Sequence, residues 1–251
     1  MDQQYIFNFK TDIYNIPITS KLNNPFSIGV SQIARIAATE FQVFISNESK
    51  NWTYDFDIKR GKMFGVLVIQ QRDNTYAYLG TVSGKLSRTV SCDQFIPSVF
   101  DDAVGDYFMN RGMTKLTEIS DQIKMTTDPI KLALLKEKRE KHSIALQRRL
   151  FENYNFSNLS GNSKNLIEIF EQCNHGNPAS GAGECAAPKL LQYAITHDLK
   201  PIALAEFWWG NSMKNEERQH KMFYPACRDK CRPILEFMLE DDLLYERRVG
   251  V

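Results

Sequence analysis

The 251-residue sequence has no long hydrophobic run and almost no net charge. Its two longest apolar stretches, MFGVLVI and PIALAEFWW, are far too short to cross a bilayer. The stretch MDQQYIFNFK has no basic start followed by an apolar run, so we expect no secretory signal. A net charge of +1 means that overall electrostatics favour neither a nucleic acid nor an acidic membrane as a partner. These absences predict that the protein has no membrane partner.

Cysteine is also scarce, with five residues in the chain. The number is odd and the spacing does not indicate a disulfide framework, so we expect reduced thiols and a cytoplasmic location. The remaining composition, 43% hydrophobic and 24% charged, is typical of globular proteins. A chain of this length can bury a full core, and we expect residues 1–251 to form a single α/β domain.

The hydrophobic pattern of the first two thirds predicts one helix, one hairpin and one helical segment. Apolar residues at helical spacing predict a helix over residues 30–46. Two apolar runs, 63–69 and 76–82, flank a polar turn and predict a β-hairpin. Residues 114–156 form a predicted helical insertion, either one helix or a hairpin, whose later half is basic.

The last third of the chain alternates more regularly. We expect a helix that starts near Glu184, a strand over 201–209, a helix over 227–239 and an edge strand within 243–249. Helices that pack on a mixed sheet bury such a set of elements most simply. The sequence therefore predicts an α/β (α+β) fold with a helical insertion.

Three cysteines stand at turns that precede predicted helices. Cys185 follows a glycine-rich turn in GAGECAAPKLLQ, whereas Cys227 and Cys231 belong to FYPACRDKC. If a helix begins at Cys227, Cys231 lies one turn later on the same face, a separation that allows both thiols to bind one ion. Helix N-termini stabilise thiolates, and thiolate is a preferred ligand of zinc. The pattern predicts one Zn²⁺ per chain, with His220 or water as the fourth ligand; the alternative is that the three cysteines are small core residues.

Two acidic residues are candidates for proton transfer. Glu184 precedes the first cysteine ligand directly. Glu206 lies on the predicted strand, where alternation places it on one face with Leu204 and Trp208. A carboxylate on such an apolar face needs a partner or a raised pKa, as functional acids often do. The alternative for Glu206 is a structural role, as a helix cap or as the partner of an arginine.

The order of these elements resembles the cytidine-deaminase-like fold. In that superfamily a His or Cys ligand stands two residues before a catalytic Glu, and a PCxxC pair completes the zinc site. In this sequence position 187 is Ala, and Pro225-Ala226-Cys227 is followed by three residues, rather than two, before Cys231. The resemblance implies a fold of this type and a zinc-dependent hydrolase that acts on a nucleobase, with a proton shuttle that is missing or relocated.

A second resemblance covers residues 25–242. The blocks GKMFGVLVI, YAYLGTVSGKL, FIPSVFD, SGAGECAAPKLLQYA, LAEFWWG and FYPACRDKCRPILEFML, in this order, are similar to the N-terminal extension of a bacterial subgroup of RluA-type RNA pseudouridine synthases. The catalytic Asp of that family lies in an Arg-Leu-Asp motif, which this sequence lacks. The resemblance implies a module of an RNA-modification enzyme that binds and positions tRNA or rRNA but does not form pseudouridine by itself.

The predicted RNA contacts lie on the basic helix, since Lys and Arg bind phosphates without reading the sequence. They are Lys138, Arg139, Lys141, Arg148 and Arg149. The alternative is an ordinary solvated helix face. A third hypothesis makes the protein an interaction module in which the 114–156 insertion forms a homodimer. The resemblances thus leave three functions open: an RNA-positioning module, a zinc hydrolase and a dimerisation domain.

Overall fold

The structure is a computed structural model of the chain. It describes residues 3–52, 54, 56, 61–86, 92–100, 102–173, 176–212 and 218–239, with the side chains of 102–107 left out. The chain divides into two compact units. The first comprises Met1–Val99, Phe156–Ser163 and Gly181–Val251, and the second comprises Phe100–Asn155 and Lys164–Ser180.

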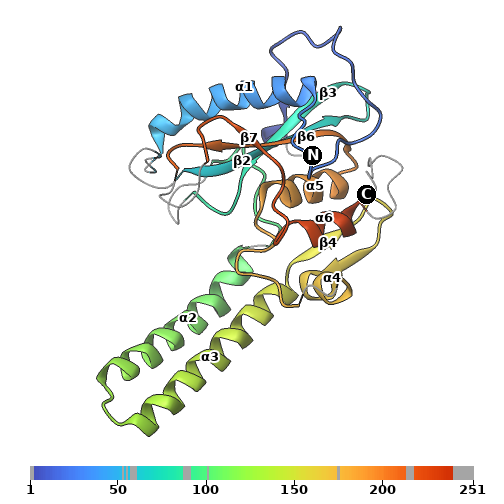
Figure 1. The fold of residues 1–251 in the computed structure, drawn as a ribbon. Coiled ribbons are helices and arrows are strands. Elements are labelled where there is room, and N and C mark those ends of the chain that lie inside the picture. Colours follow the sequence, from blue (N-terminus) through green and yellow to red (C-terminus); the bar gives the residue numbers. More distant parts are fainter. Residues whose placement is uncertain are drawn as a thin grey trace. The chain divides into compact units, whose positions relative to one another are not determined.

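The first unit is built on a five-stranded sheet with the order β1-β3-β2-β6-β7 (Figure 1). Its strands are β1 (Phe7–Asn8), β2 (Lys62–Gln70), β3 (Tyr76–Val82), β6 (Lys200–Trp209) and β7 (Phe223–Tyr224). All four pairings are antiparallel, whereas the sequence led us to expect a mixed sheet. Strands β3 and β6 do run in the same direction, but β2 lies between them and pairs with both. Among the described strands of this sheet, no two neighbours are therefore parallel.

Two helices cover opposite faces of this sheet (Figure 1). Helix α1 (Gln32–Glu48) begins at Ser31, whose side chain accepts a hydrogen bond from the N–H of Ala34. It packs on the face of β2 that carries Phe64, Val66 and Val68. Helix α5 (Ala186–Thr196) packs on the other face, against β2, β3 and β6. The central strands are therefore buried on both sides, as their nearly continuous apolar runs predict.

The second unit contains a helical hairpin. Its helices are α2 (Asp102–Met125), α3 (Pro129–Glu152) and α4 (Leu166–Gln172), and α2 and α3 lie side by side (Figure 1). Asp128 caps α3 by accepting hydrogen bonds from two backbone N–H groups, and Pro129 occupies the first turn. The predicted start at residue 114 is too late, because the aromatic residues before it show no helical period. The hairpin form of the insertion is the one observed.

The short elements complete the chain. They are the 3-10 helices η1 (Gln3–Tyr5) and η2 (Ser49–Asn51), the paired strands β4 (Asn155–Ser157) and β5 (Ser163–Asn165), and helix α6 (Arg232–Met238). The predicted α/β (α+β) class is thereby confirmed. The predicted edge strand within 243–249 lies outside the described residues. Among the helices that the structure describes, none combines the length and the apolar character that a bilayer crossing requires.

Candidate metal centre

The side chain of Cys185 does not cap α5, although Cys185 stands at the start of this helix. Cys185 is the N-cap residue, but its side chain makes no capping hydrogen bond. The first free N–H groups of the helix are satisfied from elsewhere: Ala186 N–H donates to Ser83 Oγ at 3.1 Å, and Ala187 N–H donates to Glu206 Oε1 at 3.2 Å. Because other residues satisfy these groups, the Cys185 sulfur is available for a different contact.

The other two cysteines lie in a turn and not within a helix. Helix α6 begins at Arg232, Cys231 is its N-cap residue, and Cys227 precedes it. The predicted helix over 227–239 therefore starts too early. The reason is Pro233, whose ring is tolerated in the first turn of a helix but would break a longer one. Cys227 and Cys231 are thus brought together by a turn rather than by one helical face.

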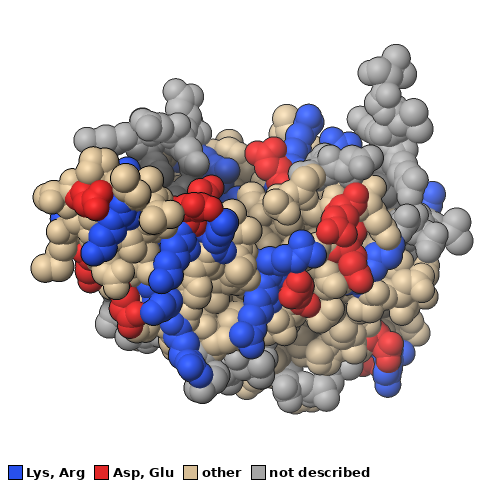
Figure 2. Space-filling model, turned by 90° about the horizontal axis from the view of Figure 1, so that it is seen from below, with Lys and Arg blue, Asp and Glu red and all other residues tan. Residues whose placement is uncertain are grey.

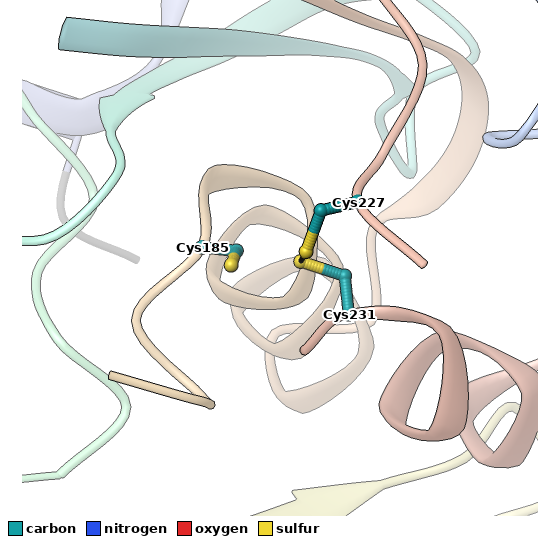
Figure 3. Close-up of side chains that lie close together, drawn as sticks. All are labelled: Cys185, Cys227 and Cys231. Carbon is teal, nitrogen blue, oxygen red and sulfur yellow. Dashed lines mark hydrogen bonds between the residues drawn. The ribbon is translucent and has the colours of Figure 1, made fainter. Parts of the chain in front are cut away.

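The three sulfur atoms converge on one point (Figure 3). The Sγ atoms of Cys185, Cys227 and Cys231 all lie within 4.8 Å of one another. Those of Cys227 and Cys231 are 3.2 Å apart and share a hydrogen bond. In a tetrahedral site with Zn–S bonds of about 2.3 Å, two sulfurs are separated by about 3.8 Å. Separations of 3.2 Å for one pair and of no more than 4.8 Å for the others are compatible with this value, so the three cysteines could hold a metal ion.

The proton affinities of the three thiols differ strongly. The pKa of Cys227 is well below its usual range, because hydrogen bonds with Cys185 and Cys231, and one from the backbone N–H of Lys230, favour its thiolate form. The hydrogen bond with Cys227 raises the pKa of Cys185 above the usual range, and the hydrogen bonds with Cys185 and Cys227 raise the pKa of Cys231; burial adds to both effects. One thiolate is thus stabilised by two thiols. A divalent cation would replace the two remaining protons, because metal ligation requires the thiolate form.

The predicted fourth ligand and one of the predicted acids lie apart from this cluster. His220 accepts a hydrogen bond at Nδ1 from the backbone N–H of Gly210, and its ring packs against Trp209. The carboxylate of Glu184 accepts a hydrogen bond from Ser98 Oγ at 3.0 Å. Neither residue joins the three cysteines in the group that could hold an ion. Within the part of the chain that the structure describes, the cluster offers three protein ligands.

Glu206 is the acidic residue that lies beside the cluster. It is 6% exposed, and it interacts electrostatically with each of the three cysteines. Burial raises the pKa of Glu206 to about 7; the hydrogen bond from Ala187 and the charge of Arg218 act in the opposite direction. The carboxyl group of Glu206 therefore gains and loses its proton near neutral pH, as catalytic acids and bases do.

The space for this arrangement comes from residues that the sequence did not single out. Gly65 on β2 pairs with Glu206 on β6, and a Cβ atom at Gly65 would lie 2.9 Å from Ala186 Cβ. Small residues on the strand and the helix thus let the start of α5 approach the sheet. Ser83, whose hydroxyl caps α5, is separated from Ala186 by 103 positions. The sequence carries no local signal that could have connected Ser83 with the helix.

The predicted RNA contacts lie on the exposed surface of α3, and most of them also contact neighbouring side chains. Lys141 and Arg148 pair with Glu137 and Glu152, one helical turn away. Two more predicted contacts reach helix α2: Arg139 Nε donates to Ser120 Oγ, and the Arg149 guanidinium lies over the Phe108 ring. Lys138 is exposed. On the face drawn in Figure 2, the coloured acidic side chains are interspersed among the basic ones.

The comparisons with known proteins give no relatives. No family model, no curated protein and no solved structure matches the chain.

Proposed function

We propose that this chain is a zinc-dependent hydrolase of the deaminase type, which removes an exocyclic amino group from a nucleobase. The observation that carries the proposal is the convergence of Cys185, Cys227 and Cys231 as a set of three ligands. Zinc sites that serve only structure commonly have four protein ligands, whereas catalytic sites have three and keep one position open. Among the residues that the structure describes, three thiols converge, and this number of ligands fits the catalytic type.

The arrangement of elements supports the same proposal. Helix α1, the β2–β3 hairpin, α5 with its first ligand, β6 and then the cysteines before α6 follow the order that the deaminase resemblance implies. Cys185 is the N-cap residue of α5, so this helix directs its positive end toward the cluster. Zinc bound by these ligands would activate a water molecule for attack on a carbon that carries an amino group.

The first experiment measures metal and activity in the same preparation. We expect about one zinc per chain by elemental analysis, lost in the Cys185→Ser, Cys227→Ser double variant. Cys92→Ser is the matched control, since Cys92 is half-buried and is not a member of the cluster. Ammonia release from cytidine, adenosine and short single-stranded RNAs tests the reaction. A folded protein without metal would overturn the proposal, and a zinc protein that deaminates none of these substrates would reduce the centre to a structural site.

The second candidate function is the RNA-positioning role that the pseudouridine-synthase resemblance implies. It is supported by the exposed basic side chains of α3. Ion pairs between exposed groups contribute little, so Lys141 and Arg148 can exchange their carboxylate partners for phosphates. We expect replacement of both by Ala to weaken RNA binding and to lower the salt dependence of log K by about 0.7–0.9 for each phosphate that is no longer neutralised. Arg72→Ala is the control, because its ion pair with Asp198 is also exposed and lies outside α3; an equal effect of the control would contradict the proposal.

The predicted homodimer stays a prediction. Several large apolar side chains of the hairpin are exposed, among them Met125, Ile130, Leu134 and Ile144. They would be covered if two hairpins packed together. Sedimentation over a range of concentrations tests this, and a mass of one chain throughout would contradict it.

A further inference from the structure

Glu206 is a buried charged group whose surroundings are not those of an ordinary core residue. Its carboxylate is 6% exposed, on the face of β6 that packs against α5. All three thiols of the candidate metal centre interact electrostatically with it. Burying a carboxylate next to thiolates is unfavourable, because desolvation and like charge both oppose ionisation. A sequence that needed only stability at this position could use an apolar residue.

The hydrogen bond of Glu206 connects its carboxylate with the start of α5, beside the candidate metal centre. Its Oε1 accepts the hydrogen bond of Ala187, the residue two positions after the ligand Cys185. A side chain from a neighbouring strand thus brings a carboxylate to the backbone of position 187, which itself carries only a methyl group. We propose that Glu206 is the catalytic acid and base of this centre, supplied by strand β6 instead of helix α5. This inference rests on the proposed hydrolase function.

The packing around Glu206 favours this placement. Gly65, its neighbour across the β2–β6 pair, has no side chain, and a Cβ atom there would lie 3.5 Å from Glu206 Cγ and 2.9 Å from Ala186 Cβ. Ala187 is fully buried and small. The small residues at 65 and 186 therefore leave room beside the acid at 206.

The reaction needs one group of this kind. Hydrolytic deamination forms a C–O bond between water and the ring carbon, breaks the C–N bond and releases ammonia. The attacking water must lose a proton, and the departing nitrogen must gain one. A single carboxylate that first accepts and then donates a proton balances both transfers, and water is the only co-reactant.

A helix cap is the competing explanation, and Glu206→Gln separates the two roles. The Gln side chain has nearly the same shape, and its Oε1 can accept the same hydrogen bond from Ala187, but it cannot take up a proton. A cap is therefore retained in this variant, whereas proton transfer is lost. Glu184→Gln is the matched control, because Glu184 has the same chemistry and its carboxylate is held by Ser98.

The experiment compares the wild-type chain, Glu206→Gln and Glu184→Gln, each loaded with zinc and, separately, with cobalt(II). We expect equal metal content in all three proteins. We expect deamination by Glu206→Gln to fall by about 10²–10⁴-fold, with little change in Glu184→Gln. In the cobalt proteins, the visible absorption spectrum measured as a function of pH reports ionisation of the water bound at the open position. We expect the midpoint of this transition to move by about one pH unit or more in Glu206→Gln and to stay unchanged in Glu184→Gln.

The outcomes separate the two proposals. Metal in all three proteins with the same cobalt titration in wild type and Glu206→Gln would overturn the role of Glu206 and leave the metal centre intact. The same holds if Glu184→Gln is the variant that loses activity. Absence of metal from the folded wild type would overturn the centre itself, and the role of Glu206 with it. If no nucleobase is deaminated, the cobalt titration still decides whether Glu206 acts on the open position.

Discussion

The burial of Glu206 should make the stability of the metal-free protein depend on pH in a way that one substitution removes. The carboxyl has a pKa of about 7 in the folded protein, compared with 4.5 for an exposed glutamate. Between these two values the folded protein keeps a proton that the unfolded chain has released. The contribution of Glu206 to folding stability therefore falls as the pH rises through this interval, and it is constant above it.

The size of this effect follows from the two pKa values. The interval from 4.5 to about 7, at about 1.4 kcal/mol per pH unit, corresponds to about 3 kcal/mol. Glu206→Gln cannot titrate, so its stability relative to the wild type should rise by about this amount between pH 4.5 and pH 7. The buried amide of Gln has a cost of its own, about 1–3 kcal/mol, but that cost is independent of pH. Only the pH-dependent part of the difference tests the reasoning.

The assay is urea unfolding of both proteins between pH 4.5 and 8.5, with a chelator and a reductant present. The titrating cysteines occur in both proteins, so only the part of their contribution that depends on the charge of Glu206 remains in the difference. In a Cys227→Ser background the rise should be smaller, because Cys227 contributes to the raised pKa of Glu206. A stability difference that is the same at pH 5 and pH 8 would refute the burial of an ionisable carboxyl beside the thiols.

Three further perturbations test other parts of the structure. A chelator should lower the Tm of the zinc-loaded wild type but leave the Tm of Cys227→Ser unchanged. Zinc at a free concentration of 1,000 times its Kd stabilises the folded protein by about 4 kcal/mol, which the chelator removes. Equal shifts of Tm in both proteins would argue against the site. Gly80→Ala should destabilise by about 1–3 kcal/mol, because its Cβ would overlap the buried ring of Phe41. The control Gly29→Ala, with no atom within 4 Å, should be neutral, and a neutral Gly80→Ala would disprove this packing. Asn165→Ala removes the capping box of α4 and should cost about 1 kcal/mol in thermal unfolding, a loss that an intact Tm would contradict.

The secondary structure around the site was largely predictable from local patterns. The β2–β3 hairpin and strand β6 match the predicted runs, because an apolar run bounded by turn residues is a local signal. Two predictions were wrong about where a helix begins, one beside the site and one in the helical hairpin. Helix α6 starts at Arg232, later than predicted, because Pro233 is tolerated only in the first turn of a helix. Helix α2 starts at Asp102, earlier than predicted, and its start was missed because the aromatic residues there hide the helical period.

The candidate site was only partly predictable. Cys185, Cys227 and Cys231 were identified from their positions beside turns and helix starts, and the structure brings these three together. His220 was included because it is near in sequence, yet its Nδ1 is held by Gly210 in the loop after β6. Nearness along the chain does not determine where a loop side chain points, so this ligand could not be predicted reliably.

By itself, the sequence determined the class of fold, the apolar runs of the central strands, and three thiols beside helix starts. These features depend on hydrophobic period and on turn residues, which act over a few positions. Only the tertiary structure decided that β2 separates β3 from β6, that Ser83 caps a helix 103 positions away, and that Glu206 reaches the backbone of Ala187. Those contacts depend on the packing of α5 against the sheet at Gly65. A contact between segments far apart in the chain produces no periodic pattern in the sequence of either segment, so it could not be predicted from such a pattern.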